Sequence, residues 1–231
     1  MFNRIDLKEQ AKVSFRANYW KCVLVSLILG LIGGGANYSV NFNFSRQDFH
    51  FSNSVDWALM LPMLTWIVGM GFVIIVIAVV ISVCVINPLK VGCLYFARNN
   101  AGAPATLEDL GVGFKSYSPA VKTMFFADLY IFLWSLLLII PGVVKSYSYR
   151  MVPYLIADHP ELSTREILDL SRSMMDGNKW EAFVLDLSFI GWNILTALTL
   201  GLVGVFYAGP YQMQTNANLY LALCQNGQSE F

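Results

Sequence analysis

The stretch LLLIIPGVVKSYSYRMVPYL, residues 136–155, decides the fold, because it is apolar enough for a membrane and yet contains Lys145 and Arg150. Charged side chains inside a bilayer are costly, so they are usually paired, functional or close enough to an interface to reach it. Pro141–Gly142 offers a tight turn in the middle of the stretch. We therefore interpret the stretch as a hairpin, in which Lys145 reaches the outer interface and Arg150 is the buried charge.

The composition supports a membrane environment for the rest of the chain as well. Of the 231 residues, 56% are hydrophobic and only 13% are charged, about half the charged fraction of a typical soluble domain. Residues 66–86 contain no Asp, Glu, Lys, Arg or His, and an apolar run of about 20 residues is long enough for a transmembrane helix. The chain is therefore predicted to be an all-α integral membrane protein.

The distribution of basic residues predicts which side each connecting segment occupies. Five bases precede or open the first apolar run, and four more fall in the connector over residues 90–122. Because cytoplasmic segments are enriched in Lys and Arg, both regions are predicted to be cytoplasmic and residues 37–56 external. A return crossing over residues 143–157 also keeps Arg165, Arg172 and Lys179 on the cytoplasmic side.

The predicted fold is a polytopic helix bundle of about six transmembrane helices in three hairpins, with two cytoplasmic amphipathic helices, all in one domain of residues 1–231. Ser163 and Glu166 form a capping-box pattern at the start of the second amphipathic helix. Trp20 and Trp180 are predicted to be interfacial anchors. The amphipathic helices are expected at 1–19 and 162–176, and the hairpins at 20–36 with 66–87, 121–140 with 143–157, and 181–198 with 202–223. Pro88 is expected to end or bend the helix over residues 66–87.

The two halves of the chain share an order of features. RANYWKCVLVSLILG, residues 16–30, aligns without gaps to DGNKWEAFVLDLSFI, residues 176–190, so that both contain an Asn-x-Trp sequence. In each half a proline and a Leu-Tyr pair follow the next hairpin. This order favours a parallel duplication. Independent convergence of membrane helices on tryptophan anchors remains the alternative.

Three charged residues are predicted to lie at one level of the membrane. Asp128, Arg150 and Asp186 each fall five to seven residues from a predicted cytoplasmic boundary, which corresponds to a depth of about 8–10 Å. An arginine can bridge two carboxylates through its fork of N–H donors. The cluster is either an ionic clamp between three helices or a functional polar site, such as an ion, proton or headgroup site open to the cytoplasm.

No catalytic or cofactor-binding pattern accompanies this cluster. Walker, nucleophile-elbow and HExxH sequences are absent, the four cysteines lack metal-like spacing, and neither histidine has a second ligand nearby. We therefore expect no enzyme activity, no cofactor and no metal. A net charge of zero argues against nucleic acid as a partner, which leaves membrane lipids and a protein partner or a second copy of the chain.

The segment PGVVKSYSYRMVPYLIADHPELSTREILDLSRSMMDGNKWEAFVLDLSFIGW, residues 141–192, resembles the bacterial domain-of-unknown-function 975 family of multi-pass membrane proteins. A more distant likeness is to the membrane domain of some glycerophosphodiester phosphodiesterases, although no phosphodiesterase domain is recognised here. The resemblance implies a place in the bacterial cytoplasmic membrane, and the charge pattern implies cytoplasmic termini.

Two functions follow from these observations. The first is a non-enzymatic membrane-interaction or assembly component, whose amphipathic helices lie along the inner leaflet. The alternative is a small transporter or a lipid-handling protein that uses Asp128, Arg150 and Asp186. A wide cavity containing Arg150 would favour the alternative, and a closed bundle around a fully paired Arg150 would favour the clamp.

Overall fold

The structure is a computed structural model that describes residues 3–31 and 57–228, and every regular element in these ranges is helical. The all-α prediction is confirmed. Three short irregular helices interrupt the α-helices: the π-helices η1 (Ser82–Ile86) and η3 (Gly204–Ala208), and the 3₁₀-helix η2 (Leu107–Gly111). The α-helices are α1 Arg4–Ala17, α2 Tyr19–Leu31, α3 Trp57–Ile81, α4 Asn87–Gly102, α5 Val112–Lys115, α6 Tyr117–Leu137, α7 Ile139–Ser148, α8 Val152–Asp158, α9 Thr164–Met175, α10 Lys179–Leu187, α11 Ile190–Leu198 and α12 Gly209–Gln228.

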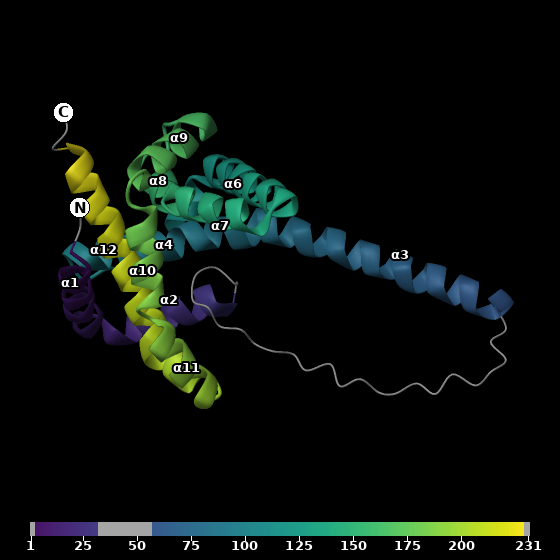
Figure 1. Cartoon of the computed structure of the whole chain (residues 1–231), viewed down its shortest axis with the longest axis horizontal. Helices are drawn as coiled ribbons and strands as arrows, with labels where there is room; N and C mark the ends of the chain where they lie inside the picture. Colours follow the sequence, from purple (N-terminus) through teal and green to yellow (C-terminus); the bar gives the residue numbers. More distant parts are fainter. Residues whose placement is uncertain (1–2, 32–56, 229–231) are drawn as a thin grey trace.

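Helices α12 and α4 lie at the centre of the molecule and pack against each other. Helix α1 runs beside α12, α6 and α7 form an adjacent pair, and α9 lies across the end of that pair (Figure 1). Helix α3 runs out of this body as a long extension (Figure 1). The bundle therefore brings the two ends of the sequence together, with α1 against α12, and α4 connects them to the α6–α7 pair through its packing against α6.

Three helical segments among the described residues are long and apolar enough to cross a membrane. They span residues 64–102, 117–137 and 179–198, and residues 19–30 form a shorter apolar helix. The side chains of α3 that the structure describes are nearly all exposed, as expected for a helix surrounded by lipid. These segments indicate a membrane protein.

The longest of these helices passes without interruption from the apolar extension into the bundle. Pro88 was expected to end or bend the second span, but α4 continues directly from α3 through η1. The amide of Asn87 bonds to the Ser82 carbonyl, in the wider i to i−5 pattern. This π-turn precedes the position where proline lacks an N–H, so the chain remains helical through Pro88.

The second half of the chain repeats this arrangement. Helix η3 is a π-helix of the same length, the Gly209 amide bonds to the Gly204 carbonyl, and Pro210 follows at once. A π-helix followed by X-Pro and a central helix thus occurs in both halves. This shared local geometry adds a structural parallel to the Asn-x-Trp repeat.

The α6–α7 hairpin reverses three residues before the expected Pro141–Gly142 turn. Leu138 is extended (φ −157°, ψ 141°) between the two helices, and Pro141 lies in the first turn of α7, where a missing N–H costs little. A Cβ built on Gly142 would lie 2.1 Å from Ser135 Oγ and 2.7 Å from Ser135 Cα. Gly142 is therefore the point of close approach between α6 and α7.

The return segment is broken, whereas a single span over residues 143–157 was predicted. Helix α7 ends at Ser148 and α8 begins at Val152, with Pro153 in its first turn. Proline cannot donate to the preceding turn, so a boundary at this position is favoured. The break places Arg150 between two short helices.

Both amphipathic helices bury their apolar faces in the bundle. In α9, Ser163 and Glu166 form the predicted capping box, which is confirmed, and hydrogen bonds with Ser163 lower the pKa of the Glu166 carboxyl. The buried residues of α9 pack against α6, α7 and α8. In α1 the buried residues Leu7, Ala11 and Phe15 recur every four positions, and the helix packs against α12. These faces are therefore covered by protein.

A buried amide network joins the central helices to α1 and α2. Asn100 donates to Gln214 Oε1 at 3.1 Å and to the Ser14 carbonyl at 3.0 Å, and it accepts from Asn18 at 3.0 Å. Gln214, which is fully buried, donates to the Ala97 carbonyl at 2.9 Å. Because buried polar groups need hydrogen-bond partners, this network fixes the position of α12 relative to α4.

Candidate functional site

A cavity of about 460 Å³ lies in the bundle between α2, α4, α6, α7, α8, α10 and α12. Apolar side chains make up part of its wall, among them Leu29, Leu94 and Met213. The wall also contains charged and phenolic side chains, namely Lys90, Asp128, Tyr147, Arg150, Tyr154 and Asp186. Cavities of this size, mostly apolar with a few convergent polar groups, are typical of small-molecule sites.

Arg150 and Asp186 form a bidentate ion pair at one wall. Arg150 Nη1 donates to Asp186 Oδ2, and Nη2 donates to Asp186 Oδ1, both at 2.7 Å. Nη2 also donates to Asn216 Oδ1 at 2.7 Å, and the Tyr147 hydroxyl donates to Asp186 Oδ2 at 2.9 Å. The side chains of the pair are 17% and 26% exposed, so water screens it only in part.

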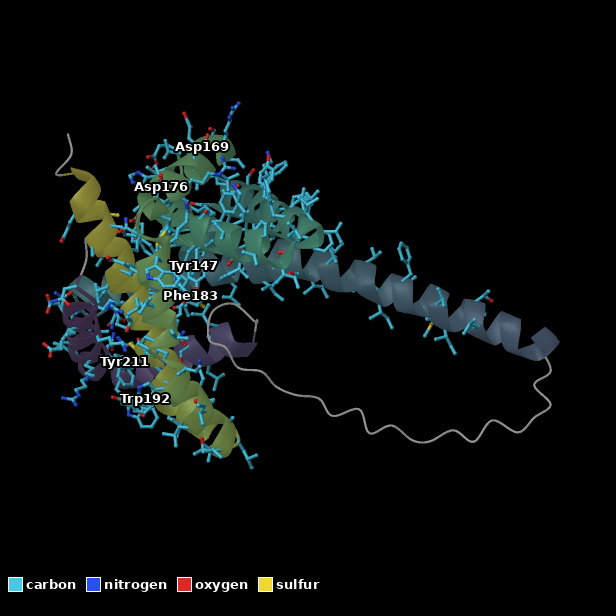
Figure 2. The ribbon with its side chains drawn as sticks, in the orientation of Figure 1. Tyr147, Asp169, Asp176, Phe183, Trp192 and Tyr211 are labelled. Carbon is cyan, nitrogen blue, oxygen red and sulfur yellow. The ribbon has the colours of Figure 1, made fainter. Side chains whose placement is uncertain are left out.

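This pair connects the break between α7 and α8 to α10 and α12. The Tyr147 ring packs edge-on against Phe183, with the ring centroids 6.2 Å apart, which is within the usual range for aromatic pairs (Figure 2). The Arg150 guanidinium lies 5.5 Å from the centroid of the Tyr147 ring. Charge, hydrogen bonding and aromatic packing thus act together at the junction of α7 and α10.

Asp128 lies outside this pair. It is on the cavity wall on α6, and its side chain is accessible. Lys90 and Asn87 of α4 are the neighbours whose charge and polarity act on Asp128, and Asp186 is the carboxylate that acts on Arg150. Of the two carboxylates expected to bind Arg150, the structure therefore places only Asp186 against it.

Lys90 and Asp128 bring opposite charges to the same cavity without forming an ion pair with any described residue. Close by, the buried Asn87 side chain is the hydrogen-bonding neighbour of Asp128. Lys90 and Asp128 are therefore charges of this cavity that the described residues do not neutralise through an ion pair.

Tyr154 provides a buried polar group that the described residues leave unused. Its side chain is only 3% exposed and its ring stacks on Tyr220, with centroids 4.9 Å apart. The Tyr220 hydroxyl donates to Asp158 at 2.7 Å, and Asp158 also pairs with Arg98 at 3.3 Å. The Tyr154 hydroxyl, by contrast, has no partner among the residues that the structure describes, although Tyr154 lines the cavity.

The two predicted tryptophan anchors occupy matching positions. Trp20 is the second residue of α2 and Trp180 the second residue of α10, and their exposed fractions are 73% and 71%. The Asn18 carbonyl accepts a hydrogen bond from the Cys22 amide, and the Asn178 carbonyl accepts one from the Ala182 amide, each at 3.0 Å. The equivalence of the two Asn-x-Trp sequences therefore extends to their local structure.

Sequence reasoning missed several residues of the cavity. Lys90 was assigned to a connector, because Pro88 was expected to end the preceding helix. Asn216 lies in the polar run of α12, whose buried amides were a signal that this helix is surrounded by protein. No cluster of potential metal ligands occurs among the described residues.

Comparison with known proteins gives one match. No curated protein and no solved structure matches the chain. Residues 59–227, which include all the elements of the cavity except α2, match the family described as protein of unknown function DUF975. The chain belongs to the DUF975 family.

Proposed function

We propose that this protein is a non-enzymatic, multi-pass protein of the bacterial cytoplasmic membrane that binds a small amphiphile in its central cavity, as a lipid-handling protein or a small transporter does. The observation that carries the proposal is the cavity of about 460 Å³ that contains Arg150. Its wall combines apolar side chains with charged groups, which suits a ligand that has both an apolar and a polar part.

The proposed topology has six crossings, with both termini in the cytoplasm. The three membrane-length helices and the α6–α7 hairpin support this arrangement, and the charge distribution supports its orientation. The crossings that contain α7–α8 and α12 are short or polar, so they would be enclosed by other helices. Trp20 and Trp180 would anchor the cytoplasmic interface.

A second candidate is a membrane-interaction or assembly component without a ligand. The three hydrogen bonds of Arg150 with Asp186 and Asn216 favour this candidate, because a structural clamp requires such pairing. The buried apolar faces of α1 and α9 argue against one form of it, in which these faces lie on the inner leaflet. A protein partner or a second copy of the chain would then contact other surfaces.

Blocking the cavity distinguishes the two candidates. Ser146 lines the cavity from α7, whereas Val144, two residues earlier on the same helix, is exposed and does not line it. Native mass spectrometry of the protein purified with membrane lipid should show a bound amphiphile in the wild type and in Val144→Trp, and its loss in Ser146→Trp. Equal lipid retention in both variants, or none in the wild type, would refute the proposed function.

A further inference from the structure

The charged residues that line the cavity fall into two groups: those that already form an ion pair with another described residue, and those that do not. Arg150 and Asp186 neutralise each other through two hydrogen bonds of 2.7 Å, and Asn216 and Tyr147 satisfy further positions on the pair. Lys90 and Asp128 form no ion pair with the described residues, and Asn87 is the neutral hydrogen-bonding neighbour of Asp128. The Arg150–Asp186 pair would therefore contact a ligand as a neutral polar surface, whereas Lys90 and Asp128 would be free to form ion pairs with it.

The available charges are one cation and one anion, on neighbouring helices. Lys90 projects from α4 and Asp128 from α6, and these helices pack against each other. Lys90 is near enough to act electrostatically on Asp128, but the two do not close into an ion pair. Two charges without ion-pair partners among the described residues are costly in a partly apolar cavity unless something else binds them. A ligand that supplies both complementary charges would remove that cost for each.

The net charge of the cavity limits the ligand further. Lys90 and Arg150 balance Asp128 and Asp186, so the four groups sum to zero, and no net field favours a purely anionic or a purely cationic ligand. A zwitterion matches a site of this kind. Its anionic group would bind Lys90, and its cationic group would bind Asp128.

The Tyr154 hydroxyl indicates which kind of anionic group the ligand carries. Its buried hydroxyl lacks a partner in the described chain, and an unsatisfied buried donor costs stability. A phosphate has several acceptor oxygens, so it could bind the Lys90 ammonium and accept from the Tyr154 hydroxyl at the same time. On the cationic side, a primary amine could donate to the Asp128 carboxylate, which a quaternary amine cannot do.

We propose that the cavity recognises an amino-phosphate zwitterion, with its phosphate held by Lys90 and the Tyr154 hydroxyl and its primary amine held by Asp128. This inference rests on the proposed function, since it specifies the polar part of the amphiphile. Apolar residues such as Leu29, Leu94 and Met124 line the same cavity and would contact its hydrocarbon. The shared chemistry occurs in a phosphatidylethanolamine headgroup and in free O-phosphoethanolamine.

Lipids that differ only in their headgroups test this recognition. The purified chain is titrated with dioleoyl phosphatidylethanolamine, phosphatidylglycerol and phosphatidylcholine, and bound lipid is counted by native mass spectrometry. One charge-assisted contact corresponds to roughly tenfold in affinity, so the wild type should prefer phosphatidylethanolamine to each of the others by about that factor. An equal affinity for all three lipids would overturn the proposal.

Charge variants assign each half of the headgroup. Asp128→Asn should abolish the preference for phosphatidylethanolamine over phosphatidylcholine, while Asp128→Glu retains it and shows that the fold survives a change at this position. Lys90→Met should weaken all three phospholipids together. Lys122→Met and Asp169→Asn, at exposed positions on α6 and α9, are the matched controls and should leave the preference unchanged. A preference that persists in Asp128→Asn would overturn the assignment of the amine.

A competition separates the two sources of the zwitterion. Displacement of the lipid by free O-phosphoethanolamine identifies a soluble ligand, and resistance to it identifies the lipid; both results keep the same recognition chemistry. Failure of this inference is also distinct from failure of the proposed function. If Ser146→Trp blocks binding but no headgroup is preferred, only the zwitterion is wrong, whereas a cavity that binds no lipid refutes both.

Discussion

Arg150 and Asp186 lie 36 residues apart in the sequence and are joined by two parallel hydrogen bonds of 2.7 Å. This fork-to-fork geometry is the strongest form of an arginine–carboxylate contact, and it fixes the orientation of both side chains. It holds the break between α7 and α8 against α10. The position of Arg150, and with it one wall of the cavity, therefore depends on Asp186.

We predict that Arg150 and Asp186 are energetically coupled. Breaking a largely buried pair leaves one charge uncompensated, so Arg150→Met or Asp186→Asn alone should lower the free energy of unfolding by about 3 kcal/mol. The double variant should lose clearly less than the sum of the two single losses. Unfolding by denaturant in mixed micelles measures all three variants.

Two further variants test whether the energetic coupling is specific to Arg150 and Asp186. Asp176→Asn removes a carboxylate that is 83% exposed and should change stability little, because surface ion pairs contribute little. Asp128→Asn combined with Arg150→Met should give additive effects, since Asp128 is not bonded to Arg150. Coupling of Asp128 to Arg150 as strong as that of Asp186 would contradict the site described here.

The close approach of α6 and α7 predicts a difference between two glycines. Gly142→Ala places a Cβ within 2.7 Å of the Ser135 Cα, so it should destabilise the hairpin by about 2 kcal/mol. Gly191→Ala in α11 meets nothing within 4 Å and should be neutral or stabilising by up to about 1 kcal/mol. Thermal unfolding followed by tryptophan fluorescence compares them, and equal effects would refute the close contact.

The amide network predicts a similar difference between two glutamines of α12. Gln214→Ala leaves the Asn100 amide and the Ala97 carbonyl without their bonds inside the bundle, so it should cost about 2–3 kcal/mol. Gln225, on the same helix, is exposed, and Gln225→Ala should have little effect. The measurement is again the unfolding free energy; a tolerant Gln214 would show that the network does not position α12.

Much of the fold could be predicted from sequence because its signals are local. The capping box at Ser163 and Glu166, the apolar run of α3 and the matching tryptophans depend on nearby residues. The exact turn at Leu138 could not be predicted, because Pro141 is compatible both with a turn and with the first turn of a helix. Only the packing of Gly142 against Ser135 distinguishes these.

The site was harder to predict than the fold for the same reason. Depth along each helix predicted that Arg150, Asp186 and Asp128 lie at one level, and the structure joins the first two by hydrogen bonds. Depth carries no information, however, about which face of a helix a residue occupies. Asp128 shares the cavity yet faces Lys90 of α4. Since Pro88 was expected to end or bend the second span, the continuation of that helix into the bundle as α4, and the position of Lys90 in the cavity wall, were not foreseen.

The proposed orientation predicts where α9 can be labelled. Ser173 is exposed on α9, whereas Ser171 on the same helix is fully buried and donates to the Ser148 carbonyl at 2.8 Å. In a background without the four native cysteines, Ser173→Cys should react with an impermeant maleimide only in inverted vesicles. Ser45→Cys, in the segment predicted to be external, should react in intact cells. Labelling of Ser173→Cys from outside would contradict the six-crossing topology.

The most direct test of the central claim is an experimental structure of the full chain in nanodiscs that contain phosphatidylethanolamine. We expect an elongated ligand density in the cavity, with its polar end between Lys90, Asp128 and Tyr154 and with the Arg150–Asp186 pair intact beside it. A cavity closed by protein side chains, or one open but empty in this lipid, would refute the proposed ligand binding.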